Sequence, residues 1–518
     1  MTPRLILINR DYTRLWFGQA VSSVGDAVFS TTLVLWVATV LAKGEAWAPM
    51  AVSGVLMASS VAVLVIGPLA GVFVDRWDKL ATLLRTEVVR GALVVVLTVV
   101  SFLPTDALPS GAWLALVYTT VLLLHAAGQF FSPARFAILA DLVTGEADRA
   151  RAAGIGQATG ETAWIIGPPI AAPLLFTAGI QWALLFNALS YAVSYVAIRS
   201  IDVRPSAGAA EAKDSAPKPA RKQKTSLRRE FADGVRFFAR SRFLVALLLL
   251  AVIGQFGLGA LSTLNVFFTT DNLHADAHLY GYIGMAMGVG GIAGALSGGR
   301  VVQWLGARRS TWVSLLVSGV LLVAYSRQTG FLGGIALLFV FTVPLTVLNT
   351  AMAPLLLAAA PAEFRGRVMA VFYPVTKLAS MLAAVLSGWL AGSVLRDVAG
   401  SVGGVRFGPI DTIFAASGVI VVLAGVFAWL ALPGTEEAEV AAGKAAKGTV
   451  GKETEEMPAE SPEKEVAGAV AEEAVAEKAA AAAVTVDRAA GTGSRHATPP
   501  AGAYGHRPPP DHERGSPE

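Results

Sequence analysis

Long runs of apolar residues, separated by short polar stretches, make up most of the sequence. A helix that crosses the hydrocarbon core of a bilayer needs about 20 apolar residues. Windows of that length give six candidate spans in the first half of the chain, at residues 15–41, 49–74, 82–104, 112–134, 153–176 and 179–198. Six more follow in the second half, at 243–269, 279–299, 310–326, 331–358, 368–392 and 410–432. The pattern predicts an all-α membrane protein with twelve transmembrane helices. The third and the eleventh windows are interrupted by charged residues, namely Arg85, Glu87, Arg90 and Lys377.

The composition agrees with this pattern and excludes several classes of protein. Hydrophobic residues make up 54% of the 518 residues and charged residues only 15%, whereas a soluble domain has roughly 25% charged residues. A disordered chain, a coiled coil and an ordinary soluble enzyme are therefore excluded. The chain has no cysteine, which excludes a disulfide scaffold, thiolate metal ligands and a cysteine nucleophile.

Motifs that would predict an enzyme, a cofactor or a metal site are missing from the sequence. It contains no G-x-x-x-x-G-K-[ST] segment, so it has no P-loop for ATP. His274 and His278 have the i,i+4 spacing of zinc ligands, but they fall in a predicted loop without a convincing third ligand. We therefore expect no catalytic residues, no cofactor and no metal.

Lysine and arginine are concentrated in every second connection between the spans. The basic connections include the N-terminal segment and residues 199–242, whereas the alternate loops hold only Lys43, Arg327, Arg396 and Arg406. Basic loops remain in the cytoplasm, so we expect a multi-pass protein of the plasma or inner membrane with both termini in the cytoplasm. The pI near 9.2 then reflects topology and not a nucleic-acid partner, which would need its charges on one soluble face.

Changes of composition divide the chain into four parts. We predict a first six-helix half over residues 1–200, a cytoplasmic linker over 201–242, a second half over 243–433 and a disordered cytoplasmic tail over 434–518. The tail is rich in Ala, Glu and Lys and then in Pro, a composition that cannot bury a core. A weak internal repeat relates the halves, because Gly71 and Gly299, 228 residues apart, each precede a polar and basic turn after the second span of a half. Two such halves are typical of a pseudo-symmetric transporter.

The loop after the second span resembles the signature loop of the major facilitator superfamily, G-x-x-x-D-R-x-G-R-R. Asp78 stands where that pattern has glycine, and Leu80 replaces the last basic residue. The resemblance implies a gating loop and a related set of residues, namely Gly71, Asp75, Arg76 and Lys79, together with Asp141, Gly299, Arg308 and Arg309. The alternative is a charge-rich loop that only sets the topology.

The fifth span is similar to the glycine- and proline-rich helix that this superfamily uses mainly in antiporters. Its matching residues are Gly160, Gly167 and Pro168. Small residues allow two helices to approach closely, and proline bends a helix by breaking its hydrogen bonds. Ordinary packing of small residues is the alternative.

Three further stretches narrow the resemblance to the branch that contains the enterobactin exporter and the macrolide-efflux proteins. They are Asn9–Ser22, Phe131–Arg135 and Glu363–Val368, and the resemblance covers about residues 5–433. It implies a monomeric secondary transporter in the lipid bilayer that exports an amphipathic small molecule, such as a drug, a macrolide or a siderophore, by proton antiport with alternating access. A proton-coupled uptake symporter, a membrane enzyme or flippase, and a non-transporting sensor are the alternatives.

Ionisable residues within the spans are costly, and each is a candidate functional group. Asp26 lies near the middle of the first span, Glu161 lies in the fifth and His125 in the fourth. A carboxyl group in a low-dielectric environment can exchange protons near neutral pH, so we expect these three to take part in proton coupling, with Asp26 first. Each has an alternative role. Asp26 could only form a hydrogen bond to a neighbouring helix, Glu161 could lie in the cytoplasmic layer of charged residues, and His125 could be a packing residue.

Other polar residues of the spans are candidates for lining a substrate cavity. Arg90 is one, although its i,i+3 neighbour Glu87 offers a simple partner. Lys377 lies about ten residues beyond Arg367, too deep for its amine to reach the interface easily, so it could counter a carboxylate or an anionic substrate. Gln255 and Asn349 add uncharged polar groups in the second half.

Overall fold

The computed structural model describes residues 7–74, 76–201, 235–360, 362–398, 400–402 and 405–431. The chain divides into two compact units, residues 1–447 and 448–518, and the described residues belong to the first. Asp75, most of the predicted linker and the whole of the predicted tail lie outside the described residues. The boundaries of those two segments therefore stay predictions.

Six long helices form the first half of the chain. They are α1 (Arg10–Trp36), α2 (Ala48–Val74), α3 (Lys79–Val100), α4 (Ser110–Leu142), α5 (Glu146–Pro173) and α6 (Ile180–Arg199). Polar caps set two of the starts: Asn9 accepts a hydrogen bond from the Tyr12 amide, and Asp78 accepts one from the Ala81 amide at 2.6 Å. Asp78, which departs from the family pattern, thus satisfies one of the free amides at the start of α3.

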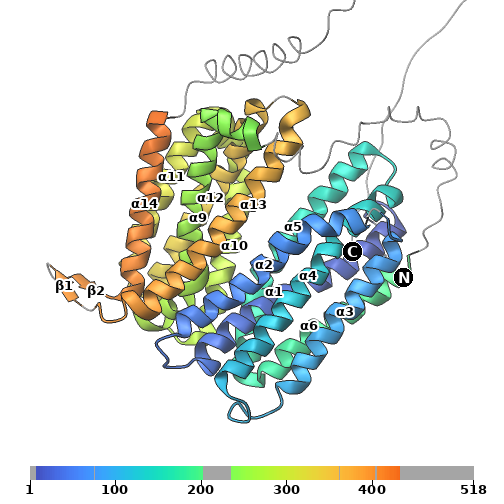
Figure 1. The fold of residues 1–518 in the computed structure, drawn as a ribbon, viewed down its shortest axis with the longest axis horizontal. Coiled ribbons are helices and arrows are strands. Elements are labelled where there is room, and N and C mark those ends of the chain that lie inside the picture. The colour runs from blue at the N-terminus through green and yellow to red at the C-terminus, as the bar shows by residue number, and fades with distance from the viewer. Residues whose placement is uncertain are drawn as a thin grey trace, which may run out of the picture. The chain divides into compact units, whose positions relative to one another are not determined.

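The second half repeats this arrangement. Its long helices are α9 (Arg242–Phe267), α10 (Tyr280–Leu305), α11 (Ala307–Ser326), α12 (Phe331–Ala359), α13 (Ala362–Trp389) and α14 (Pro409–Ala431). A short 3₁₀ turn, η4 (Ala277–Leu279), precedes α10, and the antiparallel strands β1 (Gly400–Val402) and β2 (Val405–Phe407) lie between α13 and α14, with Gly400 opposite Phe407. The helices of each half lie together in Figure 1, and all twelve predicted spans are helices.

Four π-helical turns support the internal repeat. They are η1 (Val37–Leu41), η2 (Leu174–Ala178), η3 (Phe268–Asn272) and η5 (Leu390–Val394), and they extend α1, α5, α9 and α13. These helices are the first and the fifth of each half, so the same distortion occurs at equivalent places. We call the side of the bundle where these turns lie the η end, and the opposite side, where α1 begins and α2 ends, the basic end.

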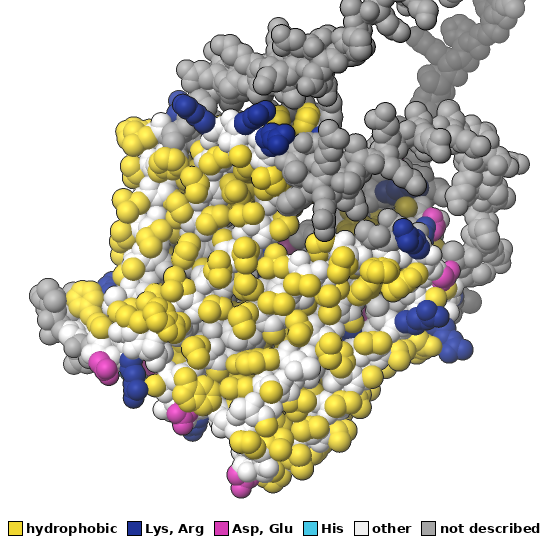
Figure 2. Space-filling view, viewed as in Figure 1, with side chains coloured by type: hydrophobic (Ala, Val, Ile, Leu, Met, Phe, Trp, Pro, Cys, Tyr) yellow, Lys and Arg dark blue, Asp and Glu magenta, His cyan; other side chains and the backbone are white. Residues whose placement is uncertain are grey.

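Ten of the helices in the described residues are long and apolar enough to cross a membrane. The two long helices that fall short are α3 and α5. Helix α3 contains Glu87 and Arg90, whereas Phe364–Val394 qualifies although it contains Lys377. Large apolar side chains cover the flank of the bundle, whereas the Lys, Arg, Asp and Glu side chains visible in this view lie toward its ends (Figure 2).

The two halves meet through α5 with α10 and through α2 with α13. Glycines make these contacts close: a Cβ atom at Gly284 would lie 2.8 Å from the Pro168 ring, and one at Gly388 would lie 2.6 Å from the Pro49 carbonyl oxygen. These contacts lie at the η end. Toward the basic end of the same four helices, a Cβ atom would meet nothing within 4 Å among the described residues at Gly71, Gly154, Gly299 and Gly366.

Candidate functional site

A cavity of about 340 Å³ lies within the first half. Helices α1, α3, α4 and α5 supply its walls. Its ionisable lining residues are Asp26, Arg90, His125 and Arg135, and Gln19, Gln129 and Trp164 complete much of the surface. Two of the predicted proton-coupling residues, Asp26 and His125, and one predicted cavity residue, Arg90, therefore share one site.

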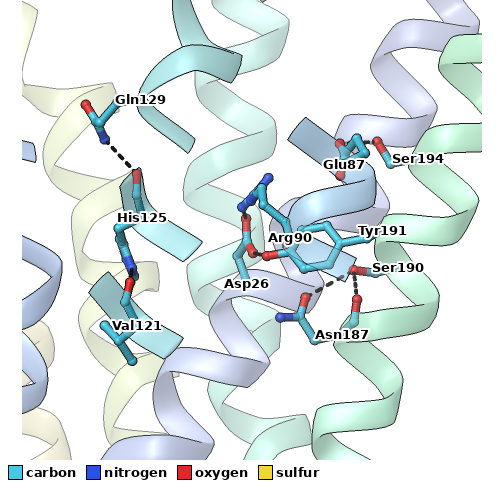
Figure 3. Close-up of polar contacts among 10 residues, drawn as sticks. All are labelled: Asp26, Glu87, Arg90, Val121, His125, Gln129, Asn187, Ser190, Tyr191 and Ser194. Carbon is cyan, nitrogen blue, oxygen red and sulfur yellow. Dashed lines mark hydrogen bonds and ion pairs between the residues drawn. The ribbon is translucent and has the colours of Figure 1, made fainter. Parts of the chain in front are cut away.

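An ion pair between Asp26 and Arg90 is the centre of this site (Figure 3). Arg90 Nη2 lies 2.7 Å from Asp26 Oδ2, and the side chains are 10% and 35% exposed, respectively. The Tyr191 hydroxyl donates a hydrogen bond to Asp26 Oδ1. The Arg90 guanidinium also lies over the Tyr191 ring, 4.4 Å from its centroid. Since Asp26 is the more exposed partner, a proton or substrate in the cavity would reach its carboxylate before the arginine.

The close approach of α1 and α6 brings Tyr191 to Asp26. A Cβ atom at Gly25 would lie 2.6 Å from Asn187 Oδ1, so only glycine leaves room for the α6 side chains there. The Ser190 hydroxyl donates to the Asn187 carbonyl oxygen at 2.8 Å. Sequence reasoning missed Tyr191, although Asn187, Ser190, Tyr191 and Ser194 have a spacing that places them on one face of a helix.

His125 contributes an imidazole to the cavity wall. Its Nδ1 atom lies 2.9 Å from the Val121 carbonyl oxygen. A carbonyl oxygen only accepts hydrogen bonds, so Nδ1 carries the hydrogen and Nε2 is the nitrogen that can take up a proton.

Glu161, the third predicted coupling residue, does not join the ion pair. Its exposed carboxylate accepts a hydrogen bond from Gln157 Nε2 at 2.8 Å on the same helix. Its neighbour Gly160 does line the cavity. The other residues of the fifth-helix motif are buried in packing, Gly167 against Ala27 of α1 and Pro168 against Gly281 and Gly284 of α10.

The predicted gating residues make contacts within each half. Lys79 Nζ lies 2.7 Å from Asp141 Oδ2 and joins the start of α3 to the end of α4. Arg308 donates from Nη2 to the Trp429 carbonyl oxygen at 3.4 Å and joins α11 to α14. Arg76 and Arg309 are exposed. The contacts observed thus join helices of the same half, and the gating role stays a prediction.

The remaining cavity candidates lie in the second half and do not line the 340 Å³ cavity. Gln255 is half-buried, whereas Asn349 and Lys377 are exposed. The interpretation of Arg90 also needs correction. Arg90 forms its ion pair with Asp26 of α1, whereas Glu87 accepts a hydrogen bond from Ser194 of α6.

A second and larger cavity of about 1440 Å³ lies at the η end. Both halves line it, with Lys43 and Glu45 from the first half and Asp271 from the second. An ion pair between Arg327 and Asp411, at 3.2 Å, lies on its wall and joins the end of α11 to the start of α14. This polar vestibule is separated from the Asp26 cavity along the bundle.

Twelve long helices in two related halves, with a charged cavity inside the bundle, define a multi-pass membrane transporter. The chain belongs to the Major Facilitator Superfamily, whose sequence pattern matches residues 15–325 and 247–484. Members of this family are transporters and not enzymes.

Curated relatives and solved structures agree with this assignment. The putative bacilysin exporter BacE of Bacillus amyloliquefaciens is 32% identical over 201 residues, which is 37% of this chain and 46% of the exporter, so the match spans about half of that relative. Macrolide efflux protein A of Streptococcus pyogenes is 21% identical over 387 residues, which is 73% of this chain and 89% of that protein. The crystal structure of the nucleoside transporter NupG superposes with a TM-score of 0.62 over 82% of this chain and 99% of NupG, at 12% identity. That likeness shows the fold alone.

Proposed function

We propose that this protein exports an amphipathic small molecule in exchange for protons, with its basic end in the cytoplasm of the cell. The observation that carries the proposal is the Asp26–Arg90 ion pair on a cavity wall. The partly exposed carboxylate can bind either a proton or a cationic group of the substrate, each of which displaces Arg90. Competition for one carboxylate is the simplest basis for antiport, and it needs a coupling of about 1–3 kcal/mol.

The export direction is supported by two relatives whose names describe export, BacE and macrolide efflux protein A. The orientation is supported by the distribution of lysine and arginine, which favours a cytoplasmic basic end. With that orientation, the close contacts between the halves at Gly284 and Gly388 lie on the outer side, and the open space beside Gly154 and Gly299 lies on the cytoplasmic side. This arrangement is the one expected of an exporter that collects its substrate from the cytoplasm.

Alternating access is supported by the glycines of the four helices at the interface between the halves. Gly154 lies 11 residues, about three turns, before Ile165 on α5, and Gly299 lies 11 residues after Gly288 on α10. Ile165 and Gly288 are in contact at the η end. Gly154 and Gly299 therefore lie on the same helix faces, and we expect them to meet when the basic end closes.

Uphill transport by Asp26→Asn is the decisive measurement. Asparagine imitates the permanently protonated carboxyl, so we expect normal insertion and retained downhill exchange but no proton-driven accumulation in vesicles with an imposed pH gradient. Glu161→Gln is the matched control, because Glu161 lies outside the ion pair.

The outcomes separate the alternatives. If Asp26→Asn still concentrates a macrolide or a cationic dye and Glu161→Gln does not, coupling belongs to α5. If both variants still concentrate it, neither carboxylate couples. Movement of the substrate in the same direction as the protons, and not in the opposite direction, would identify an uptake symporter.

A further inference from the structure

Two charged residues one turn apart on α3, Glu87 and Arg90, each hold a buried polar atom without a hydrogen-bond partner among the described residues. Glu87 is 1% exposed. Its Oε1 atom accepts a hydrogen bond from the Ser194 hydroxyl at 2.7 Å, but its Oε2 atom has no partner. On Arg90, Nη2 binds Asp26 while Nε has no partner. One of the two unpartnered atoms is an acceptor and the other a donor.

Their placement makes them natural partners for each other. Residues three apart on a helix are neighbours on its surface. A buried polar atom without a partner is costly, and a buried charge without one more so. A rotation of the Arg90 side chain away from Asp26 would therefore bring its guanidinium toward the Glu87 carboxylate. Figure 3 shows the present arrangement, in which Arg90 is directed to Asp26 and Glu87 to Ser194.

We propose that Arg90 exchanges carboxylate partners, pairing with Asp26 while that residue is ionised and with Glu87 once Asp26 has bound a proton. Glu87 is then a positioning residue that acts through Arg90. This inference rests on the proposed proton coupling at Asp26. It assigns to Glu87 the task of keeping Arg90 paired when the cavity-facing carboxylate becomes neutral.

The surroundings leave Glu87 as the available alternative. Asp26 and Glu87 are the two carboxylates beside Arg90, and Tyr191 is a neutral phenol that already donates its hydroxyl hydrogen to Asp26. On the α4 side, His125 and Arg135 line the same cavity, and Lys377 of α13 interacts with His125. These three groups are neutral or cationic, so none can accept the guanidinium as a carboxylate would.

Burial gives the two carboxylates different access. Asp26 lines the cavity, whereas Glu87 does not. A proton that arrives from the cavity therefore meets Asp26 first and displaces Arg90, whose side chain is only 10% exposed. Without Glu87 the displaced guanidinium would remain as a buried unpaired charge, and protonation of Asp26 would be opposed.

The first test is the pH dependence of transport. Glu87→Gln preserves the shape of the side chain but removes the second partner of Arg90. We therefore expect the pH at which proton-driven efflux is half-maximal to fall by about one unit, which corresponds to an about tenfold higher proton concentration. Ser194→Ala is the matched control, because it removes the hydrogen bond to Oε1 and leaves the carboxylate. Equal shifts in the two variants, or no shift in Glu87→Gln, would overturn the partner exchange.

The second test does not depend on transport. Thermal unfolding of purified protein in detergent is compared for Asp26→Asn, Glu87→Gln and the double variant. Each single variant leaves Arg90 one carboxylate, whereas the double variant leaves it none. We therefore expect the unfolding temperature of the double variant to fall by more than the sum of the two single changes.

Additive changes would contradict the proposal, whatever the transport data show. A non-additive loss supports partner exchange even if Asp26→Asn still transports uphill, so this inference and the proposed proton coupling can fail separately. If Glu87→Gln does not accumulate, Glu87→Asp replaces it, since the shorter side chain keeps the charge but cannot reach Arg90 equally well. A smaller acid shift is then expected, and an unchanged midpoint would contradict the proposal.

Discussion

At the scale of single residues, we expect the Tyr191 hydroxyl to influence the pH dependence of the proposed coupling at Asp26. It donates to Asp26 Oδ1, and a donor favours the charged carboxylate over the protonated form. Tyr191→Phe keeps the ring beneath Arg90 and removes only this donor. A hydrogen bond to a charged group contributes about 1.5–3 kcal/mol, so we expect the midpoint of efflux to move to higher pH by about one unit or more.

The control for Tyr191→Phe lies on the same helix. Tyr195, four residues later, accepts only a long hydrogen bond from exposed Arg199 at 3.5 Å, and Tyr195→Phe should leave the pH profile unchanged. Because Glu87→Gln is expected to shift the profile in the opposite direction, the two substitutions together test the sign of each interaction. A shift of Tyr191→Phe toward acid would contradict the role given to the hydroxyl.

The residue scale is also where sequence reasoning reached its limit. Asp26 and His125 were identified because ionisable groups inside apolar spans are rare and costly. The partner of Arg90 could not be identified in this way, since the i,i+3 rule considers only neighbours on one helix. The observed partner, Asp26, lies 64 residues away in the sequence, and it is brought there by the packing of α1 and α3 against α6.

At the scale of helices, the small residues of α5 and α10 should act differently at the two ends of the bundle. Gly154→Leu adds a side chain that the present state can accommodate but that would obstruct closure of the basic end. We expect this variant to insert normally and to lose transport while remaining open at the basic end. Gly156→Leu is the control, because Gly156 also meets nothing within 4 Å but lies on a different face of α5.

A single introduced cysteine can report the state of these variants. The chain has no cysteine of its own, so Ser23→Cys in the cavity wall gives one labelling site. In Gly154→Leu, we expect a membrane-impermeant thiol reagent to label it only from the basic end, with or without substrate. Labelling from the η end would show that the variant still alternates.

The helical pattern was predictable and its irregularities were not. Apolar windows identified all twelve long helices, because the bilayer requires about 20 apolar residues per helix, although α3 and α5 are less apolar than the other ten. The π-helical turns at the η end have no comparable sequence signal, and the charges at the start of α5 concealed that this helix begins at Glu146. Asp78 stands where the family pattern has glycine, and the sequence did not indicate that its side chain caps α3.

At the scale of the whole molecule, the tail should be dispensable for transport. The described bundle is complete by Ala431, and the composition of residues 434–518 is unsuited to burying a core. We expect a chain that stops after Pro433 to insert and to export at the rate of the full chain, measured as efflux per inserted molecule. Loss of export with normal insertion would instead favour a regulatory or sensing role for the tail.

The charges of α3 have a consequence for the synthesis of the protein. By insertion scales, each charged residue at the centre of a membrane helix costs about 2.5–3.5 kcal/mol, and Glu87 and Arg90 both lie near the middle of Lys79–Val100. Helix α1 and its Asp26 are made before α3, but α6 emerges about 100 residues later. Opposite charges one turn apart let α3 enter the bilayer as a largely self-neutralised segment. The hydrogen bonds to Asp26 and Glu87 form only when α6 brings Tyr191 and Ser194 to them, so these polar contacts cannot be complete before the last helix of the first half has been made.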